Sequence, residues 1–228
     1  MFTLSAVVPW GRSFDEYRRM FALTEADLAS RILGCGDGPA SFNAELTRRG
    51  GRVVSCDPLY QFDAGQIRRR IDETSAEVLE QARWNAHEFM WDSAIPDVDA
   101  LERVRMAAMT AFLDDYEVGR RAGRYVVAGL PSLPFADGAF DLALCSHFLF
   151  LYSQQRDAAF HVESMRELCR VAREVRVFPL VALGGQPSPH LDSARAAVRA
   201  GGWYVSIEPV PYEFQRGGNQ MLRARGVE

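Results

Sequence analysis

The sequence predicts an α/β fold, a Rossmann-like doubly wound sheet of seven strands with a helical insertion after the second strand. Short apolar runs alternate with helical segments along most of the chain. A glycine turn joins the first apolar run to a helix, and residues 64–120 carry almost only helical signals. The sheet is expected to be mostly parallel, with an antiparallel pair at its C-terminal edge, because the last two strands follow each other without a helix. One domain is expected over residues 1–228, since no linker divides the chain.

Each element follows from a local signal. Ser13 is an expected N-cap, Gly50 ends a helix, and Pro58 stops a strand. An ordinary crossover needs only about a dozen residues, so the helical segment is an insertion, and Pro96 breaks it into two or three helices. Strands are expected at residues 31–35, 52–56, 124–128, 140–145, 174–181, 203–207 and 220–225, and helices at 13–30, 39–49, 157–169 and 190–199.

The composition excludes several classes of protein. The 228 residues are 48% hydrophobic and carry a net charge of −4, which is typical of a globular chain and gives no footprint for nonspecific nucleic-acid binding. The four cysteines are widely spaced, so we expect reduced thiols in a cytoplasmic protein and no metal site. The N-terminal segment lacks a basic region, and Pro9, Trp10 and Gly11 interrupt its apolar run, so we expect no signal peptide. No stretch approaches the roughly 18 apolar residues of a membrane span, so none is expected.

A glycine turn and an acidic residue mark one binding site. Gly34, Gly36 and Gly38 follow the first strand in the segment ILGCGDGPASF, where backbone must turn tightly or approach a ligand closely. Asp57 lies 19 residues after Gly38, at the end of the next strand. A carboxylate there can accept both hydroxyls of a ribose. Dinucleotide sites have a third glycine at the position that Pro39 holds here, which disfavours NAD(P).

A third motif leads into the fourth strand. The segment LPSLPFADGAFDLALCSHF contains Leu133-Pro134-Phe135, Asp137 and Phe140-Asp141 in a characteristic order and spacing. With the glycine turn and Asp57, this pattern resembles the class I S-adenosylmethionine (SAM)-dependent methyltransferases, especially the small-molecule branch that includes quinone-biosynthesis methylases. The resemblance covers residues 31–57 and 124–181.

The resemblance implies a cofactor, a substrate class and a set of site residues. The cofactor is SAM, the acceptor a small molecule. By this resemblance, the glycine turn would flank the methionine part of SAM, and Asp57 would hold its ribose. Leu59 or Tyr60 would pack on its adenine. His147 is the candidate general base, with a backbone-bonding strand-end histidine as the alternative. The expected cofactor-binding residues are Gly34, Cys35, Gly36, Gly38, Asp57, Pro58, Leu59, Leu130, Cys145 and Ser146.

Two positions depart from the family's pattern. The family has an acid two residues before the first glycine and another four residues before the LPF segment, and these positions are Ile32 and Gly129 here. Arg12, Asp37 and Asn43 are candidates to replace them.

Alternatives to methyl transfer remain open at this point. One is a SAM-binding protein without transfer, motivated by Ile32 and Gly129. Another is an NAD(P)-dependent oxidoreductase, although Tyr152 has Arg156 where a Tyr-x-x-x-Lys pair needs lysine. The CSHF segment lacks both the D/N-P-P-Y motif and the Pro-Cys nucleophile of nucleic-acid methyltransferases. Four aromatic residues of the insertion form either a substrate lid or the insertion's own core, namely Trp84, Trp91, Phe112 and Tyr116.

Overall fold

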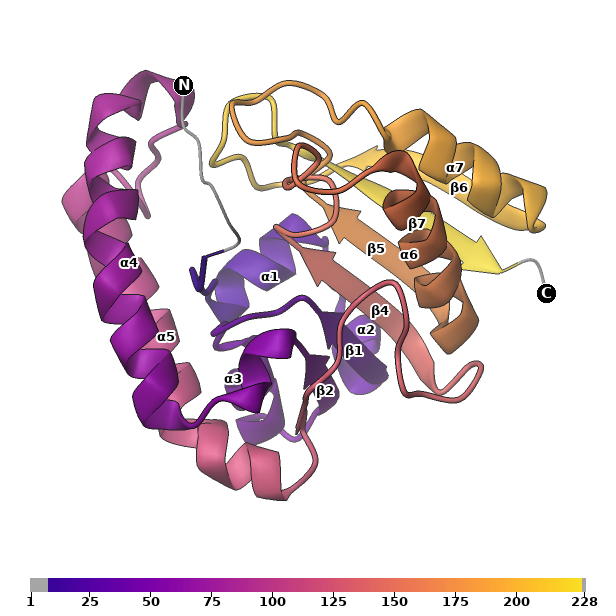
Figure 1. The fold of residues 1–228 in the computed structure, drawn as a ribbon, viewed down its shortest axis with the longest axis horizontal. Coiled ribbons are helices and arrows are strands. Elements are labelled where there is room, and N and C mark those ends of the chain that lie inside the picture. The colour runs from indigo at the N-terminus through magenta and orange to yellow at the C-terminus, as the bar shows by residue number, and fades with distance from the viewer. Residues whose placement is uncertain (1–7, 227–228) are drawn as a thin grey trace.

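The computed structural model describes residues 8–226, and its centre is a seven-stranded sheet in the order β3-β2-β1-β4-β5-β7-β6 (Figure 1). Six strands are parallel, and β7 runs antiparallel to both of its neighbours. The expected mostly parallel sheet with its antiparallel C-terminal pair is therefore confirmed. The strands are β1 (Arg31–Cys35), β2 (Arg52–Cys56), β3 (Tyr125–Val126), β4 (Phe140–Ser146), β5 (Ala172–Phe178), β6 (Trp203–Pro209) and β7 (Gln220–Gly226).

Helices cover both faces of the sheet, and two long helices stand beside it (Figure 1). The N-terminal helices α1 to α3 pack on one face, and α6 and α7 pack on the other. No helix among residues 8–226 is both long and apolar enough to cross a membrane. The helices are α1 (Phe14–Met20), α2 (Glu25–Ala29), α3 (Phe42–Arg48), α4 (Ala64–Trp84), α5 (Val98–Arg121), α6 (Ala158–Val171) and α7 (Leu191–Ala200), with 3-10 turns at Pro58–Gln61 and Ala86–Glu88.

Side chains alternate between the two faces along the central strands. Leu142 and Leu144 of β4 belong to the core under α1 and α3, whereas Ala143 and Cys145 belong to the core under α6 and α7. This alternation follows from the two-residue period of a strand. It places consecutive residues at the end of β4 on opposite sides of the sheet.

The expected helix over residues 13–30 is wrong as one element. The chain turns at Ala22, whose φ is +47°, and Thr24 begins α2 with a capping box. The first core-facing helix is therefore α1 alone, and its Tyr17 and Phe21 are buried. The helix expected from Pro39 begins three residues later, at Phe42, and β3 is shorter than predicted.

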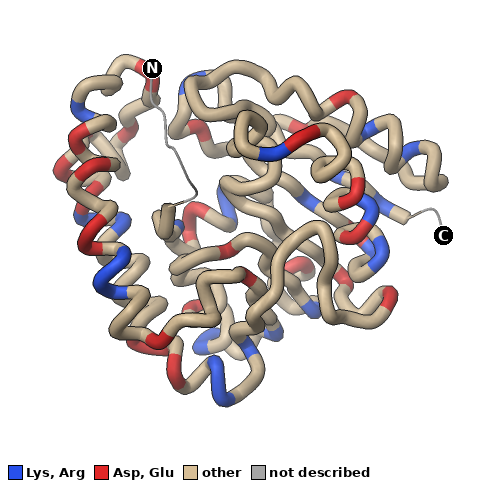
Figure 2. The backbone as a smooth tube through the Cα atoms, viewed as in Figure 1, with Lys and Arg blue, Asp and Glu red and all other residues tan. Residues whose placement is uncertain are grey.

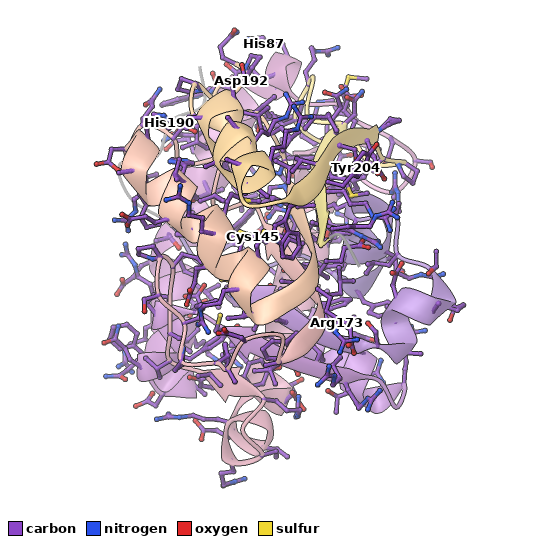
Figure 3. The ribbon with its side chains drawn as sticks, turned by 90° about the vertical axis from the view of Figure 1, so that its right-hand side faces the viewer. His87, Cys145, Arg173, His190, Asp192 and Tyr204 are labelled. Atoms are coloured by element: carbon purple, nitrogen blue, oxygen red, sulfur yellow. The ribbon has the colours of Figure 1, made fainter. Side chains whose placement is uncertain are left out.

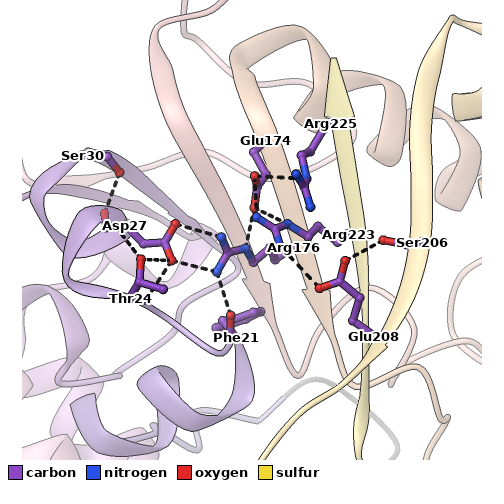
Figure 4. Close-up of polar contacts among 10 residues, drawn as sticks. All are labelled: Phe21, Thr24, Asp27, Ser30, Glu174, Arg176, Ser206, Glu208, Arg223 and Arg225. Atoms are coloured by element: carbon purple, nitrogen blue, oxygen red, sulfur yellow. Dashed lines mark hydrogen bonds and ion pairs between the residues drawn. The ribbon is translucent and has the colours of Figure 1, made fainter. Parts of the chain in front are cut away.

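A buried arginine joins the N-terminal helices to the C-terminal half of the sheet (Figure 4). Arg176 of β5 is 2% exposed and donates to both carboxylate oxygens of Asp27 in α2. It also donates to Glu174, which accepts from Arg223 of β7. Because each charged group has partners, this network satisfies a buried guanidinium at the interface between α2 and the sheet.

The insertion consists of α4 and α5, with Pro96 in the connection between them. Phe112 and Tyr116 of α5 pack with Tyr60 and Tyr125, which fixes the insertion to the end of β2 and to β3. Trp84 is 73% exposed and belongs to no core. Charged residues of both signs lie along α4 (Figure 2), as expected for a helix with one solvated face.

A buried ion pair joins the insertion to α1. Arg105 of α5 is fully buried and donates to Glu16 of α1 at 2.6 Å, and the Tyr212 hydroxyl donates to the other oxygen of Glu16 at 2.7 Å. Burial alone would raise the pKa of Glu16, but Arg105 and Arg12 lower it to about 2. Glu16 is therefore ionised at any physiological pH.

Candidate functional site

A cavity of about 680 Å³ lies between the carboxyl ends of the parallel strands and the inner side of α4. Its size is within the range of small-molecule sites, and its position is the usual one for ligands of such sheets. Four strand ends contribute residues to its wall. They are Gly36 after β1, Asp57 after β2, Leu130 after β3, and Ser146 with His147 at β4.

The glycine turn after β1 needs glycine for two different reasons. Gly36 and Gly38 have φ values of +68° and +52°, a region that side chains disfavour. Gly34 has no side chain because the Asp37 carboxylate fills that space, and a Cβ there would lie 1.8 Å from its Oδ2. The Phe148 ring packs over Gly36, within 3.0 Å of where a Cβ would stand.

Asp57 joins the second strand to the glycine turn. Its Oδ2 accepts from the Gly38 N–H at 2.9 Å, and its Oδ1 accepts from the Leu59 N–H at 2.7 Å. Burial raises the pKa of Asp57, although these two backbone donors oppose the shift. The carboxylate lines the cavity and has free lone pairs beyond its two backbone bonds.

Asp37 is a second, more deeply buried carboxylate in the cavity wall. It is 7% exposed, and it accepts from Tyr17 Oη at 2.8 Å and Ser55 Oγ at 2.6 Å. Burial raises its pKa to about 6, despite these two hydroxyl donors. No cation pairs with Asp37 among residues 8–226, so this end of the cavity has an excess of negative charge.

The pKa of Asp37 predicts how the stability depends on pH. A carboxyl group whose pKa is higher in the folded state stabilises the fold below its unfolded pKa, and this stabilisation is lost as the pH rises through about 6. At pH 8 we expect Asp37→Asn to be more stable than the wild type by about 1–3 kcal/mol, and the difference to vanish below pH 4. Urea unfolding at both pH values measures this, with the exposed Asp114→Asn as control. A difference that does not depend on pH would contradict the assignment.

The surroundings of Ile32 and Gly129 explain why neither position carries the acid of the class I methyltransferase pattern. Ile32 is fully buried in the apolar core under α1, where a carboxylate would lack partners. Gly129 faces the Pro58 ring, and a Cβ would lie 3.0 Å from its Cγ. Of the candidate replacements, Arg12 and Asp37 line the cavity, whereas Asn43 is buried and bonded to Ser55 and the Arg124 carbonyl.

His147 directly follows β4 and has a strained conformation, with a φ of +50°. Its Nδ1 lies 2.9 Å from Ser146 Oγ, and the residues described show no protein partner for Nε2. Burial lowers the pKa of His147 well below its usual value, and Arg12 and Arg105 lower it further. The imidazole is therefore neutral at pH 7.

The cavity gathers most of the residues expected from the sequence but leaves three outside its wall. Gly34, Cys35 and Cys145 do not line it. The Cys35 and Cys145 side chains point into the core beneath α6, the helix in front of Cys145 in Figure 3, and burial raises the pKa of the Cys145 thiol to about 12. The expected residues that line the cavity are Gly36, Gly38, Asp57, Pro58, Leu59, Leu130, Ser146 and His147.

The far half of the cavity is apolar and comes from segments that sequence motifs did not indicate. Its wall joins α4, α5 and the loops after β4, β5 and β6, and no local pattern shows that these segments meet. The wall contains other residues of the insertion but none of the four aromatic residues expected as a lid or a core, Trp84, Trp91, Phe112 and Tyr116. The apolar wall residues are Val78, Ala82, Phe89, Leu101, Leu151, Leu183 and Phe214.

The amino-acid sequence is similar to that of another protein along nearly its whole length. No family model matches the chain. The sequence is 33% identical over 223 residues to the uncharacterized protein MJ0045 of Methanocaldococcus jannaschii, with 97% of each chain covered. The chain belongs to the family of MJ0045.

The fold of the chain is similar to that of the solved structure of the mitomycin 7-O-methyltransferase MmcR. That structure matches with a TM-score of 0.50 at 15% identity over 94% of this chain, which spans about half (54%) of the length of that enzyme. A Burkholderia thailandensis 1,6-didemethyltoxoflavin-N1-methyltransferase matches with a TM-score of 0.49 at 14% identity, over 93% of this chain and 79% of that one. The MmcR likeness confirms the Rossmann-like methyltransferase fold for this member of the MJ0045 family.

Proposed function

We propose that the protein is a SAM-dependent methyltransferase that acts on a small-molecule acceptor. The observation that carries this proposal is the pair of carboxylates, Asp37 and Asp57, at the glycine-turn end of the cavity. SAM carries a cationic sulfonium and a cationic ammonium group, which suit this negative end. A dinucleotide would instead bring its anionic pyrophosphate to the turn, against the Asp37 carboxylate.

The residues at the cofactor end fit the parts of SAM. Asp57 accepts from the ribose hydroxyls, while Pro58, Leu59 and Leu130 provide apolar surface for adenine. The backbone at Gly36 and Gly38 leaves room for the methionine part, and Asp37 holds its ammonium group. When bound, SAM supplies an electrophilic methyl group.

His147 serves as the base on the acceptor side. Its neutral imidazole has a free Nε2, and Ser146 holds the ring through Nδ1. A histidine with a lowered pKa is a weak base, so it assists acceptors that lose their proton readily. The apolar half of the cavity orients the acceptor and excludes water.

The volume of the cavity supports a small acceptor, and the state of the cysteines supports a cytoplasmic location. A cavity of about 680 Å³ holds a cofactor and a small acceptor, and does not require a macromolecule. We propose that the acceptor is not a nucleic acid. The four cysteines are free and buried, as in a protein of the reducing cytoplasm, and residues 8–226 contain no cluster of metal ligands.

Calorimetry with S-adenosylhomocysteine, together with methyl transfer from labelled SAM to the small-molecule fraction of a cell lysate, tests the proposed function. We expect binding of S-adenosylhomocysteine, no comparable binding of NADH, and transfer to a small molecule. His147→Ala is expected to lower the transfer rate roughly 100-fold with unchanged S-adenosylhomocysteine affinity.

Each failure has a distinct meaning. Absence of S-adenosylhomocysteine binding at millimolar concentration would refute the cofactor. Binding without any transfer would favour a SAM-binding protein that is not an enzyme. Full activity of the His147→Ala variant would remove its role as base. The exposed His87→Ala is the matched control, because His87 lies outside the cavity.

A further inference from the structure

A buried cluster next to the cavity contains more positive than negative charge. Arg12 is 9% exposed and lines the cavity, and Arg105 is fully buried behind it. The charged carboxylate of the cluster is Glu16, and the cluster also contains the neutral hydroxyl of Tyr212. Two guanidinium groups thus share one carboxylate.

Glu16 has little capacity left for Arg12. Its carboxylate already accepts from Arg105, from Tyr212, and from the backbone and hydroxyl of Ser13. Arg12 donates through Nη1 to the Trp10 carbonyl at 2.8 Å, and its Nε has no partner within residues 8–226. Burial and the neighbouring Arg105 lower the pKa of Arg12 to about 10, so it remains charged at neutral pH. A buried cation with an unused donor is unfavourable unless an anion approaches it.

The guanidinium of Arg12 reaches the apolar half of the cavity, although the backbone carbonyl of Arg12 accepts from the Ser41 N–H at the start of α3. Arg12 donates to the carbonyl of Trp10, which packs against the buried cluster that contains Leu151 and Leu183. Arg105 lies over the ring of Phe214. Leu151, Leu183 and Phe214 belong to the far half of the cavity wall. Arg156, before α6, also lines the cavity and is exposed, whereas Arg69 and Arg70 lie in the first turns of α4, next to the 3-10 turn that follows Asp57. The apolar half of the cavity therefore contains a buried cation, Arg12, whose Nε has no partner among residues 8–226.

We propose that the methyl acceptor is an apolar molecule that carries a carboxylate, and that the guanidinium of Arg12 binds this carboxylate. The inference rests on the proposed function and names its class of substrate. A planar guanidinium with free donors matches a carboxylate in geometry and charge. The methionine part of SAM carries a carboxylate too, and the experiment separates these two sources.

The test is a fluorine NMR titration with two matched probes, 6-fluoro-2-naphthoate and its neutral amide, 6-fluoro-2-naphthamide. In the wild type, with S-adenosylhomocysteine bound, we expect the carboxylate to bind at least about tenfold more tightly than the amide. In Arg12→Gln the preference should disappear, and in Arg12→Lys it should be intermediate. Arg103→Gln, at an exposed position of α5 outside the cavity wall, is the matched control and should retain the preference.

The same variants separate the acceptor from the cofactor. S-adenosylhomocysteine and 5′-methylthioadenosine, which lacks the amino-acid part, should bind Arg12→Gln with wild-type affinity. A loss of affinity in Arg12→Gln for S-adenosylhomocysteine alone would show that Arg12 binds the cofactor's carboxylate, and would overturn the inference.

Other results also decide the question. Equal affinity of the two probes in the wild type, no binding of either, or a preference that survives in Arg12→Gln would overturn the inference. If Arg12→Gln does not fold, Arg12→Lys provides the same comparison. Failure of the proposed function has a different signature, because S-adenosylhomocysteine then does not bind even the wild type, whereas the probes alone still report the preference.

Discussion

Replacing Asp57 by alanine is expected to weaken binding of S-adenosylhomocysteine about 100- to 1,000-fold. The carboxylate is held in place by the Gly38 and Leu59 N–H groups and lines the cavity with lone pairs to spare. Hydrogen bonds to a charged group contribute about 1.5–3 kcal/mol each, and a ribose offers two hydroxyls. Calorimetric titration of the folded variant measures the loss, and Asp57→Asn should show a smaller one.

The ribose assignment can be separated from a general loss of structure. 5′-Methylthioadenosine has the same ribose, so its affinity should fall by the same factor as that of S-adenosylhomocysteine. The exposed Asp72→Ala on α4 is the control. Unchanged affinity for 5′-methylthioadenosine would place the ribose away from Asp57.

Replacing Arg105 by alanine is expected to lower the free energy of unfolding by about 3–5 kcal/mol. Arg105 is fully buried and joins α5 to Glu16 of α1, so its loss leaves a buried carboxylate with an ionised state that burial disfavours. The variant also leaves a cavity beside Phe214, whose ring lies under the guanidinium. Urea unfolding followed by circular dichroism measures the change.

A double variant shows whether charge or packing carries this effect. Glu16→Gln with Arg105→Met removes this ion pair and keeps most of the volume, but it leaves the buried Arg12 without a carboxylate, so it should recover part of the stability. Arg103→Ala, on the exposed side of the same helix, should change the stability by less than about 0.5 kcal/mol. A loss below about 1 kcal/mol in Arg105→Ala would contradict the assignment of Arg105 as the main connection between the insertion and α1.

Asp37 is a residue of the cavity wall whose surroundings could not be predicted from the local sequence. The position of Ile32 in the sequence indicates only that the family's usual acid is missing. The fold then supplies a carboxylate from Asp37, because the absent side chain of Gly34 leaves room for it and Tyr17 and Ser55 provide hydroxyl donors. Neither donor is near Asp37 in the sequence, so no motif signals this arrangement.

The period of the strands explains the limits of the site prediction at β4. The sequence indicates correctly that Cys145, Ser146 and His147 stand at the end of this strand. Successive side chains alternate between faces, so Cys145 points beneath α6 while Ser146 lines the cavity. His147 follows the strand, and its positive φ turns it out of this alternation into the cavity wall. Which face carries the cavity depends on where the insertion lies, and this is a tertiary property.

The sequence by itself determined the alternation of strands and helices that builds the sheet, the tight glycine turn after the first strand, and the presence of a helical insertion after the second. These features depend on local rules, namely apolar periodicity, glycine conformations and the breaks at proline. Only the tertiary structure decided that α4 closes the cavity, that Asp37 is its second carboxylate, and that Arg12 and Arg105 share Glu16. Such contacts join residues up to 89 positions apart, and burial in the folded chain sets their charges and pKa values, which no local pattern encodes.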